Sequence, residues 1–182
     1  MAPPEEGVKG EGLKGKRRVV VDVAGLVRVD ERNLYYTTPE VLDELRDEAS
    51  KAIVEEKVRR GILIVREAGE AFLEKALSEA ERTGDRDVLS KPDLTLLALL
   101  LELSEEGDAV LKTDDYALQN IASTLGLPVE TILGEKIRER IKWRIYCKEC
   151  GRFFPGGRVG MPCPECGAPL TRKAVHKRRE KR

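Results

Sequence analysis

The chain has 182 residues, of which 41% are hydrophobic and 36% charged, enough for one domain with its own core and a small appendage. Its longest apolar run, residues 94–101, is too short to span a bilayer. No apolar segment follows its start, so we expect no secretory signal and a cytoplasmic location. Residues 1–140 carry 21 basic and 30 acidic side chains, whereas residues 141–182 carry 12 and 3, so the basic C-terminal part is expected to contact a polyanion.

Residues 1–16 are rich in Pro, Gly, Glu and Lys and have little to bury, so we expect this segment to be disordered. The first ordered element is a β-branched run over residues 17–23, which is typical of a central parallel strand. This strand carries Asp22 near its end. A carboxylate among valines is unfavourable unless it faces a polar site or a cation, which favours a functional role over that of a turn former.

A helix is expected to begin at Pro39, because proline suits the first helical position. Val41, Leu42 and Leu45 form its apolar stripe. Glu44 lies at the edge of this stripe. Its position alone is typical of a solvated surface acid.

The next elements alternate in type. A helix over residues 49–60 precedes an apolar strand over residues 62–65, and a second helix over residues 68–82 ends at Gly84. Strand followed by helix is the repeating unit of an α/β sheet. The pattern therefore predicts a mostly parallel sheet covered by helices.

A helix over residues 94–103 is predicted to be deeply buried, since it is apolar on nearly every face. Ser90 and Asp93 precede it with the spacing of a capping box, in which Asp stands where Glu or Gln is preferred. The start of this helix is also expected at the crevice of the sheet, where a carboxylate can bind a metal ion. Capping and metal binding are equally supported for Asp93 by the local pattern.

The stretch around Thr113 predicts a strand that gives way to a helix. Residues 109–111 form a short apolar run suited to a buried strand, and apolar residues repeat at helical spacing from Tyr116 onward. Asp114 and Asp115 therefore lie at the carboxyl end of a strand, where the ligand crevice of an open α/β sheet forms. One helix cap needs one residue, so a metal-binding or catalytic role for at least one of the pair is favoured.

The first domain is expected to end at residue 134. Residues 127–133 resemble a short edge strand, since Pro128 is excluded from a central one. The charged segment over residues 135–145 is expected to be a helical linker to a second unit. Trp143 is expected to pack against that unit rather than stack on a base.

Four cysteines form two CxxC pairs that are each followed by glycine and are separated by twelve residues: Cys147, Cys150, Cys163 and Cys166. Two such knuckles can hold one tetrahedral zinc ion through four thiolates, and the glycines allow the tight turns. Disulfides are the alternative, but an intracellular location argues against them, and no βαβ pattern nearby supports a redox role. A zinc ion with four cysteine ligands has no open position, so its expected role is structural.

The unit around these cysteines, residues 146–173, is basic, and so is the tail over residues 174–182. Nucleic acid is the expected partner, and a simply solvated charged surface is the alternative. The side chains expected to contact RNA are Lys148, Arg152, Arg158, Arg172 and Lys173. His176 is the only histidine and lies in the tail, so a histidine general base is not expected.

Taken together, these segments resemble the Nin-one-binding (NOB) family of ribosome-maturation endonucleases, which are PIN-domain nucleases with a zinc ribbon. The resemblance covers nearly everything from Arg17 to Lys173. It is most specific in four stretches: Tyr36 to Asp47, Thr83 to Asp85 with Leu89 to Leu99, Thr113 to Asn120, and the cysteine ribbon. It implies a three-layer α/β PIN domain over residues 17–134 and a small β zinc ribbon over residues 146–173.

The resemblance also implies the residues of the site. Four acids gather divalent metal ions in PIN nucleases, and by motif these are Asp22, Glu44, Asp93 and Asp115, with Asp114 as a neighbour. Asp22, Asp93 and Asp115 are the implied ligands of Mg²⁺ or Mn²⁺, and Glu44 changes from a surface acid to a site residue. The family commonly has Thr or Ser directly after the first aspartate, whereas Val23 and Ala24 stand here, so a hydroxyl that assists the site is missing at that position.

The implied activity is metal-dependent cleavage of precursor small-subunit ribosomal RNA at the mature 3′ end, on the pre-ribosomal particle and with ribosome-assembly proteins as candidate partners. Clustered carboxylates suit Mg²⁺ or Mn²⁺, and such an ion can offset their repulsion of the scissile phosphate and activate a water molecule. Two alternatives stay open. One is a zinc-ribbon RNA-binding module with an inactive PIN domain, and the other is a general PIN ribonuclease of the toxin type.

Overall fold

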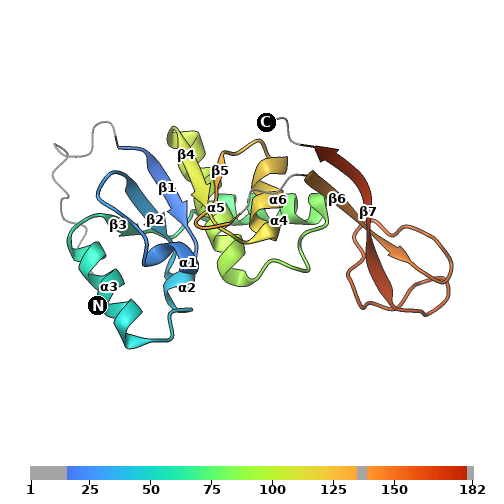
Figure 1. The fold of residues 1–182 in the computed structure, drawn as a ribbon. Coiled ribbons are helices and arrows are strands. Elements are labelled where there is room, and N and C mark those ends of the chain that lie inside the picture. Colours follow the sequence, from blue (N-terminus) through green and yellow to red (C-terminus); the bar gives the residue numbers. More distant parts are fainter. Residues whose placement is uncertain (1–15, 135–138, 180–182) are drawn as a thin grey trace.

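The computed structural model describes residues 16–134 and 139–179, which form two consecutive units. The first is a five-stranded parallel sheet flanked by helices, and the second is a two-stranded antiparallel ribbon that projects from one end of it (Figure 1). The predicted α/β class, with a mostly parallel sheet followed by a small β unit, is confirmed. Residues 1–15 of the segment predicted to be disordered lie outside the described part of the chain.

The sheet has the strand order β3-β2-β1-β4-β5, and every neighbouring pair is parallel. Its strands are β1 (Arg18–Val21), β2 (Leu34–Thr37), β3 (Leu63–Val65), β4 (Ala109–Lys112) and β5 (Val129–Glu130). β5 lies at an edge, as the preceding proline predicts. The sequence pattern does not separate β2 from the helix that follows it.

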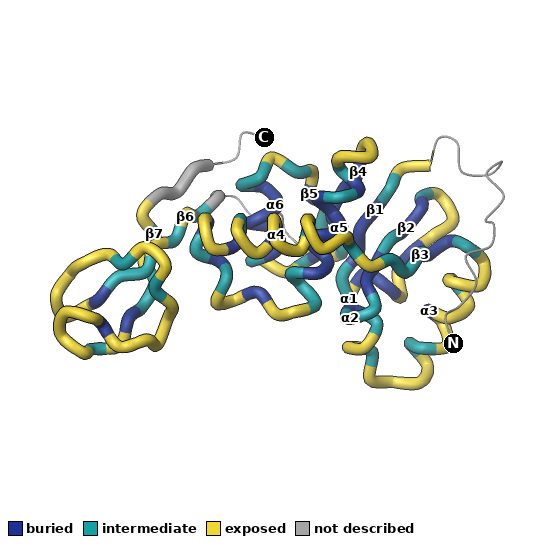
Figure 2. The backbone as a smooth tube through the Cα atoms, turned by 180° about the vertical axis from the view of Figure 1, so that it is seen from behind, coloured by how far each residue is buried: buried dark blue, intermediate teal, exposed yellow. Residues whose placement is uncertain are grey.

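The helices that flank the sheet are α1 (Val23–Leu26), α2 (Pro39–Leu42), α3 (Glu48–Arg59), α4 (Glu70–Thr83), α5 (Lys91–Glu106) and α6 (Tyr116–Thr124). α5 is the central helix, since it packs against β1, β4, α2 and α4. Residues 95–101 are all buried, as predicted for a helix that is apolar on nearly every face. Figure 2 shows burial concentrated in the sheet and α5, whereas α4 and the ribbon are largely exposed. No helix in the described ranges is long and apolar enough to cross a membrane.

The strand order creates a crevice between β1 and β4. The chain places β2 and β3 on one side of β1 and β4 on the other, so β1 and β4 flank a topological switch point. Val21, at the end of β1, pairs with Lys112, at the end of β4. The residues that follow, Asp22 and Thr113, therefore emerge side by side at the carboxyl edge of the sheet, where ligands bind in such folds.

Helix α2 is shorter than its apolar stripe predicts. It ends at Leu42, and α3 begins after Asp47, whose side chain accepts a hydrogen bond from the Ser50 N–H at 2.8 Å. Aspartate favours such a cap over a helix interior, which explains why one continuous helix does not form. Glu44 consequently lies in the turn between α2 and α3.

The prediction of a helical linker over residues 135–145 is wrong for its described part. Residues from Glu139 onward form strand β6 (Glu139–Cys147), and residues 135–138 lie outside the described chain. The signal that should have indicated a strand is an alternation of period two, in which Ile141, Trp143 and Ile145 are partly buried. The charged residues between these positions, although common in solvated helices, occupy the exposed face of a strand.

The ribbon is also longer than predicted. β6 pairs antiparallel with β7 (Leu170–Arg179), so the ribbon extends beyond the predicted range of 146–173 at both ends. Most of the predicted tail over residues 174–182 thus belongs to a strand. The last three residues of that tail lie outside the described chain.

A buried polar contact joins the ribbon to the sheet domain. The Asn120 side chain in α6 donates to Asp85 Oδ2 (2.9 Å) and to the Ile141 carbonyl (3.0 Å), and it accepts a hydrogen bond from the Ile141 N–H (2.8 Å). Arg172 Nη1 lies 4.0 Å from Asp85 Oδ1, and the Arg172 guanidinium carbon lies 4.2 Å from the centre of the Trp143 ring. Since Asp85 is only 1% exposed, specific hydrogen bonds away from water hold the start of β6 in place.

Candidate functional site

Asp22 is held in a fixed orientation directly after β1. Its Oδ1 accepts a hydrogen bond from the Gly25 N–H (2.9 Å) and so caps α1, and its Oδ2 accepts one from the Thr113 hydroxyl. Burial raises the pKa of Asp22; the hydrogen bonds from Thr113 and Gly25 oppose this rise, and the charges of Asp114 and Asp115 add to it. A carboxylate in this setting is stabilised in its charged form by a nearby cation.

Thr113 supplies the hydroxyl that is missing after Asp22 in the sequence. It is fully buried at the end of β4, where its Oγ1 donates to Asp22 and accepts from the Asp115 N–H at 3.0 Å. Val23 and Ala24 carry no hydroxyl group, but Asp22 still has a hydroxyl partner, which comes from the end of another strand. No local pattern in the sequence indicates this role, because it depends on the pairing of β1 with β4.

Asp115 and Asp114 have different partners. Asp115 caps α6 through Oδ1, which accepts two backbone hydrogen bonds at 2.7 and 2.8 Å, and its Oδ2 has no hydrogen-bond partner among the described residues. Asp114 accepts backbone hydrogen bonds from residues 132–134, the shortest at 2.8 Å. Desolvation raises the pKa of Asp114, but these backbone donors outweigh it and leave the pKa below its ordinary value. Asp114 thus anchors a loop beside the crevice.

The capping box predicted at the start of α5 is confirmed, and Asp93 belongs to it. Asp93 Oδ2 accepts from the N–H and the hydroxyl of Ser90, both at 2.8 Å, while Ser90 Oγ accepts from the Asp93 N–H at 3.3 Å. Within the described chain, Oδ1 of Asp93 has no hydrogen-bond partner. Capping and metal binding are therefore compatible for this residue.

Glu44 lies in the turn after α2, and the charges of the same group of acids affect its pKa. Burial raises the pKa of Glu44, and the negative charges of Asp93 and Asp22 raise it further. Such effects between partly exposed charges are short-ranged, so these carboxylates lie near one another. Periodicity alone placed Glu44 on the surface, and its side chain is indeed exposed, but on the side of the crevice.

The acids form an open group rather than a closed cage. Among the residues that the structure describes, only the cysteines bring three or more potential ligand atoms within 4.8 Å of one another. Asp22, Asp93 and Asp115 each use oxygen atoms for caps, and Asp93 and Asp115 each keep one oxygen free. Oxygen donors with unneutralised charge fit Mg²⁺ or Mn²⁺, and Mg²⁺ in proteins is commonly held by one or two carboxylates with water completing its shell.

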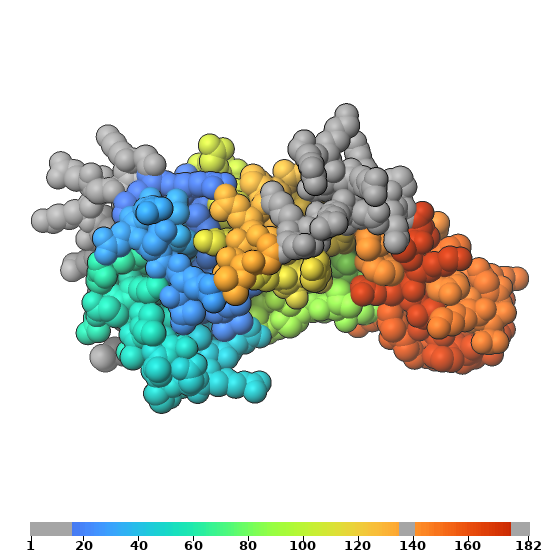
Figure 3. All heavy atoms as spheres, viewed as in Figure 1, coloured from blue at the N-terminus to red at the C-terminus, as the bar shows by residue number. Residues whose placement is uncertain are grey.

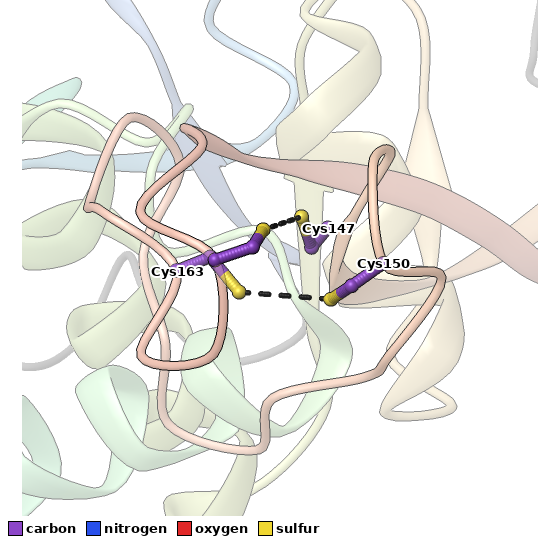
Figure 4. A group of neighbouring side chains, drawn as sticks. Cys147, Cys150 and Cys163 are labelled. Atoms are coloured by element: carbon purple, nitrogen blue, oxygen red, sulfur yellow. Dashed lines mark hydrogen bonds between the residues drawn. The ribbon is translucent and has the colours of Figure 1, made fainter.

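The four cysteines converge as the spacing predicts. Cys147 Sγ lies 3.5 Å from Cys166 Sγ, Cys150 Sγ lies 3.7 Å from Cys163 Sγ, and all four sulfurs lie within 4.8 Å of one another (Figure 4). A tetrahedral zinc ion with bonds of about 2.3 Å separates its sulfur ligands by ~3.8 Å. A disulfide requires about 2.05 Å. The arrangement fits a four-cysteine metal site and not a pair of disulfides.

The two cysteine knuckles share one backbone design. The Gly151 N–H donates to the Cys147 carbonyl (3.0 Å), and the Gly167 N–H donates to the Cys163 carbonyl (2.8 Å). Both glycines have positive φ angles, 72° and 76°, which explains why glycine follows each pair. A backbone hydrogen bond from Cys150 lowers the pKa of the Cys147 thiol to about 7, so this ligand loses its proton readily.

The residues predicted to contact RNA differ in their surroundings. Lys148 and Arg158 are exposed and have no ion-pair partner within the described ranges, and Lys173 is also exposed. Arg152 forms a surface ion pair with a glutamate of the second knuckle. Arg172 is engaged at the junction with the sheet domain, which indicates a structural role for this residue.

Known proteins resemble this chain over both units. A family profile described as the PIN domain of ribonuclease matches residues 19–103. The chain is 35% identical to the Endoribonuclease Nob1 of Methanocaldococcus jannaschii over 167 residues, which cover 90% of this chain and 81% of that protein. It is 39% identical to the Endoribonuclease Nob1 of Pyrococcus abyssi over 135 residues (74% and 81%) and 38% identical to the Ribonuclease VapC3 of Aeropyrum pernix over 119 residues (63% and 86%). A match over 90% of the chain necessarily includes most of the sheet domain and most of the ribbon.

Proposed function

The chain belongs to the Nob1 endoribonuclease family, and we propose that its crevice acids form a metal-dependent centre that cuts precursor small-subunit ribosomal RNA at the mature 3′ end. The observation that carries this proposal is the convergence of Asp22 and Asp115 at the switch point between β1 and β4, where Thr113 hydrogen-bonds to both. Asp93 and Glu44 add negative charge from the start of α5 and the turn after α2.

The chemistry follows from the donor set. Asp22, Asp93 and Asp115 would hold Mg²⁺ or Mn²⁺. When bound, such an ion would neutralise charge on the scissile phosphate and would activate a water molecule. Thr113 keeps the Asp22 carboxylate in one orientation, and Glu44, with its raised pKa, is suited to accept a proton from the attacking water. No protein nucleophile is required.

The ribbon complements the acidic domain. Its four cysteines would hold one structural zinc ion, and thiolate ligands of this kind suit a cytoplasmic location, where thiols persist. Lys148, Arg152, Arg158 and Lys173 would contact RNA phosphates and so overcome the repulsion exerted by the acidic domain. The partner is then the pre-ribosomal particle, together with assembly proteins that bind it.

The two alternative functions explain less. A binding module with an inactive PIN domain does not require acids after β1, after β4 and at the start of α5, and this chain has acids at all three places. A general ribonuclease has no need for a ribbon, and the match to the Ribonuclease VapC3 covers only 63% of this chain. The long Nob1 matches support cleavage of a ribosomal precursor.

The test is incubation of the protein with Mn²⁺ and a small-subunit precursor RNA that spans the mature 3′ end, followed by mapping of the new ends. We expect one predominant cut at the mature 3′ end, which disappears when Mn²⁺ is omitted. Cuts of similar rate at many positions would support the general ribonuclease. Tight binding without any cut over a wide range of Mn²⁺ concentrations would support the inactive binding module.

A further inference from the structure

A cleft of about 800 Å³ separates the sheet domain from the ribbon. Figure 3 shows the ribbon projecting from the body of the molecule. Residues at the end of α4 line the cleft. Both units line it: Arg82 and Arg86 come from the α4 side, and Lys142, Arg144 and Arg158 come from the ribbon. Its volume is in the range of clefts that hold a ligand of nucleotide size.

The cleft has an excess of positive charge. Five of its lining residues are basic and two are acidic, although the sheet domain as a whole is acidic. Only Arg82 among these basic residues has an ion-pair partner in the described chain, a carboxylate 2.6 Å away. Lys142, Arg144 and Arg158 are exposed and have no ion-pair partner within the same ranges, although the Arg144 guanidinium lies over the Phe153 ring at 4.6 Å. Cations that converge without counter-ions favour binding of a polyanion.

Arg86 also lines the cleft, and part of its guanidinium is buried. Its Nε is buried and has no hydrogen-bond acceptor among the described residues. An unpaired buried donor is unfavourable, and within the described residues no carboxylate forms an ion pair with this guanidinium. Phosphate is the ligand that matches a guanidinium best, because its oxygens can accept two parallel hydrogen bonds.

Aromatic side chains complete the cleft. Trp143 and Phe154 line it, and the Arg172 guanidinium covers one face of the Trp143 ring at 4.2 Å. Bases of any sequence stack favourably on aromatic rings, because every base has a π-face. Unpaired cations beside aromatic rings are the combination that recognises a single nucleic-acid strand.

We propose that this cleft is an RNA-binding site in which Lys142, Arg144 and Arg158 bind phosphates of a single strand and Trp143 contacts a base. The inference rests on the proposed function, because it states where the substrate lies beyond the cut. The loop after α4 joins the cleft to the start of α5, where Asp93 lies, so a strand that follows this loop leads from the ribbon into the crevice.

Contacts with the ribbon and with α6 hold this loop in place. A Cβ atom at Gly84 would lie 2.7 Å from the Trp143 carbonyl oxygen, so the two units touch closely here. Asp87 accepts a hydrogen bond from the Val159 N–H at 2.9 Å, and Asp85 is buried at the Asn120 contact. These contacts hold the loop after α4 against the ribbon at the wall of the cleft.

Trp143 is the only tryptophan, so its fluorescence reports on the cleft directly. In an Asp22→Asn background, which prevents cleavage, we expect a short single-stranded RNA to quench this fluorescence in a saturable manner. In the double variant Lys142→Gln/Arg158→Gln, the slope of log affinity against log salt should become shallower by about 1.4, since each phosphate contact contributes about 0.7. The matched control Lys51→Gln/Arg59→Gln removes two charges from α3 at the other end of the molecule and should change neither quantity.

The proposal is overturned if RNA binds, as shown by electrophoretic shift, without quenching Trp143, or if both double variants change the slope equally. These outcomes are independent of cleavage. If RNA quenches Trp143 fluorescence but the wild-type protein does not cut the RNA, the cleft proposal stands and the proposed function is refuted. If the wild-type protein cuts at the mature 3′ end but RNA does not quench Trp143 fluorescence, the proposed function stands and the cleft proposal is refuted.

Discussion

Replacing Asn120 with alanine is predicted to detach the ribbon from the sheet domain at a large cost in stability. The amide makes two hydrogen bonds to the Ile141 backbone, at 3.0 and 2.8 Å, and one to the Asp85 carboxylate at 2.9 Å. Neutral hydrogen bonds contribute about 1 kcal/mol each, and one to a charged group contributes about 1.5–3 kcal/mol. The variant should therefore lose about 3–5 kcal/mol of unfolding free energy, a large part of the ~5–15 kcal/mol typical of a folded protein.

This loss should depend on pH through Asp85. Burial raises the pKa of Asp85, and hydrogen bonds from Thr83 and Asn120 oppose the rise. An acid with a raised pKa binds more protons in the folded state than in the unfolded state, so stability falls as the pH rises from its ordinary value through its folded value. Without Asn120 the pKa of Asp85 rises further, and the deficit should be smaller near about pH 4 than near about pH 7.

Urea unfolding, followed by circular dichroism and by the fluorescence of Trp143 in β6, measures both the loss and the detachment of the ribbon. The chain's other asparagine provides the control, since Asn33 donates one hydrogen bond to Tyr35 at 3.3 Å. Asn33→Ala should lose no more than about 1 kcal/mol. If Asn120→Ala is no less stable than Asn33→Ala at neutral pH, the contact does not hold the two units together.

Without added Mg²⁺ or Mn²⁺, Asp22→Asn should raise the melting temperature at neutral pH, because burial and neighbouring acids raise the pKa of Asp22. A gain of ~1 kcal/mol in unfolding free energy corresponds to about 2–4 °C. This gain should disappear as the pH falls below the ordinary pKa of aspartate. A lower melting temperature in calorimetry at neutral pH would contradict this. Metal analysis should find one zinc ion per chain, and Cys150→Ser should remove it and unfold the ribbon locally, whereas two disulfides and no metal would refute the site. Gly25→Ala should slow cleavage more than it weakens RNA binding, because the new Cβ would lie 2.9 Å from Val21 Cβ and displace α1 together with its Asp22 cap. Gly69→Ala is the control, since the nearest atom to its new Cβ would lie 3.7 Å away. Equal cleavage rates in the two variants would contradict this role of α1.

Local sequence patterns predicted most of the α/β order, because each of those elements carries its own signal. The apolar runs of β1, β3 and β4 and the apolar surface of α5 are readable without tertiary contacts. Asp22 and Asp115 could be placed from these runs, since parallel strands end at one edge of the sheet. The cysteine site was equally accessible, because each knuckle forms within a few residues.

Other features depend on contacts between distant segments and were missed for that reason. Residues 139–147 are charge-rich, and only pairing with β7, more than twenty residues later, selects a strand over a helix. The Thr113 hydroxyl reaches Asp22 only through the register of β1 and β4. Asn120 and Asp85 form a buried polar pair between α6 and the loop after α4, and no periodic pattern in the sequence indicates such a pair. Glu44 was assigned by family resemblance alone, because periodicity placed it in solvent.

The central claim is that acids at the carboxyl edge of the sheet perform the cut. Asp22→Asn, Asp93→Asn and Asp115→Asn keep a side chain that can cap a helix but remove the charge that holds a metal ion. Asp108→Asn is the matched control, because Asp108 precedes β4 at the opposite edge of the sheet, whereas Asp115 follows it.

The decisive measurement is the Mn²⁺-dependent cleavage rate of precursor RNA for these four variants, with RNA affinity measured in parallel. The three crevice variants should bind RNA as the wild type does and fail to cut it, while Asp108→Asn should bind and cut normally. Full activity in all three crevice variants, or an equal loss in Asp108→Asn, would contradict a nuclease centre at the switch point.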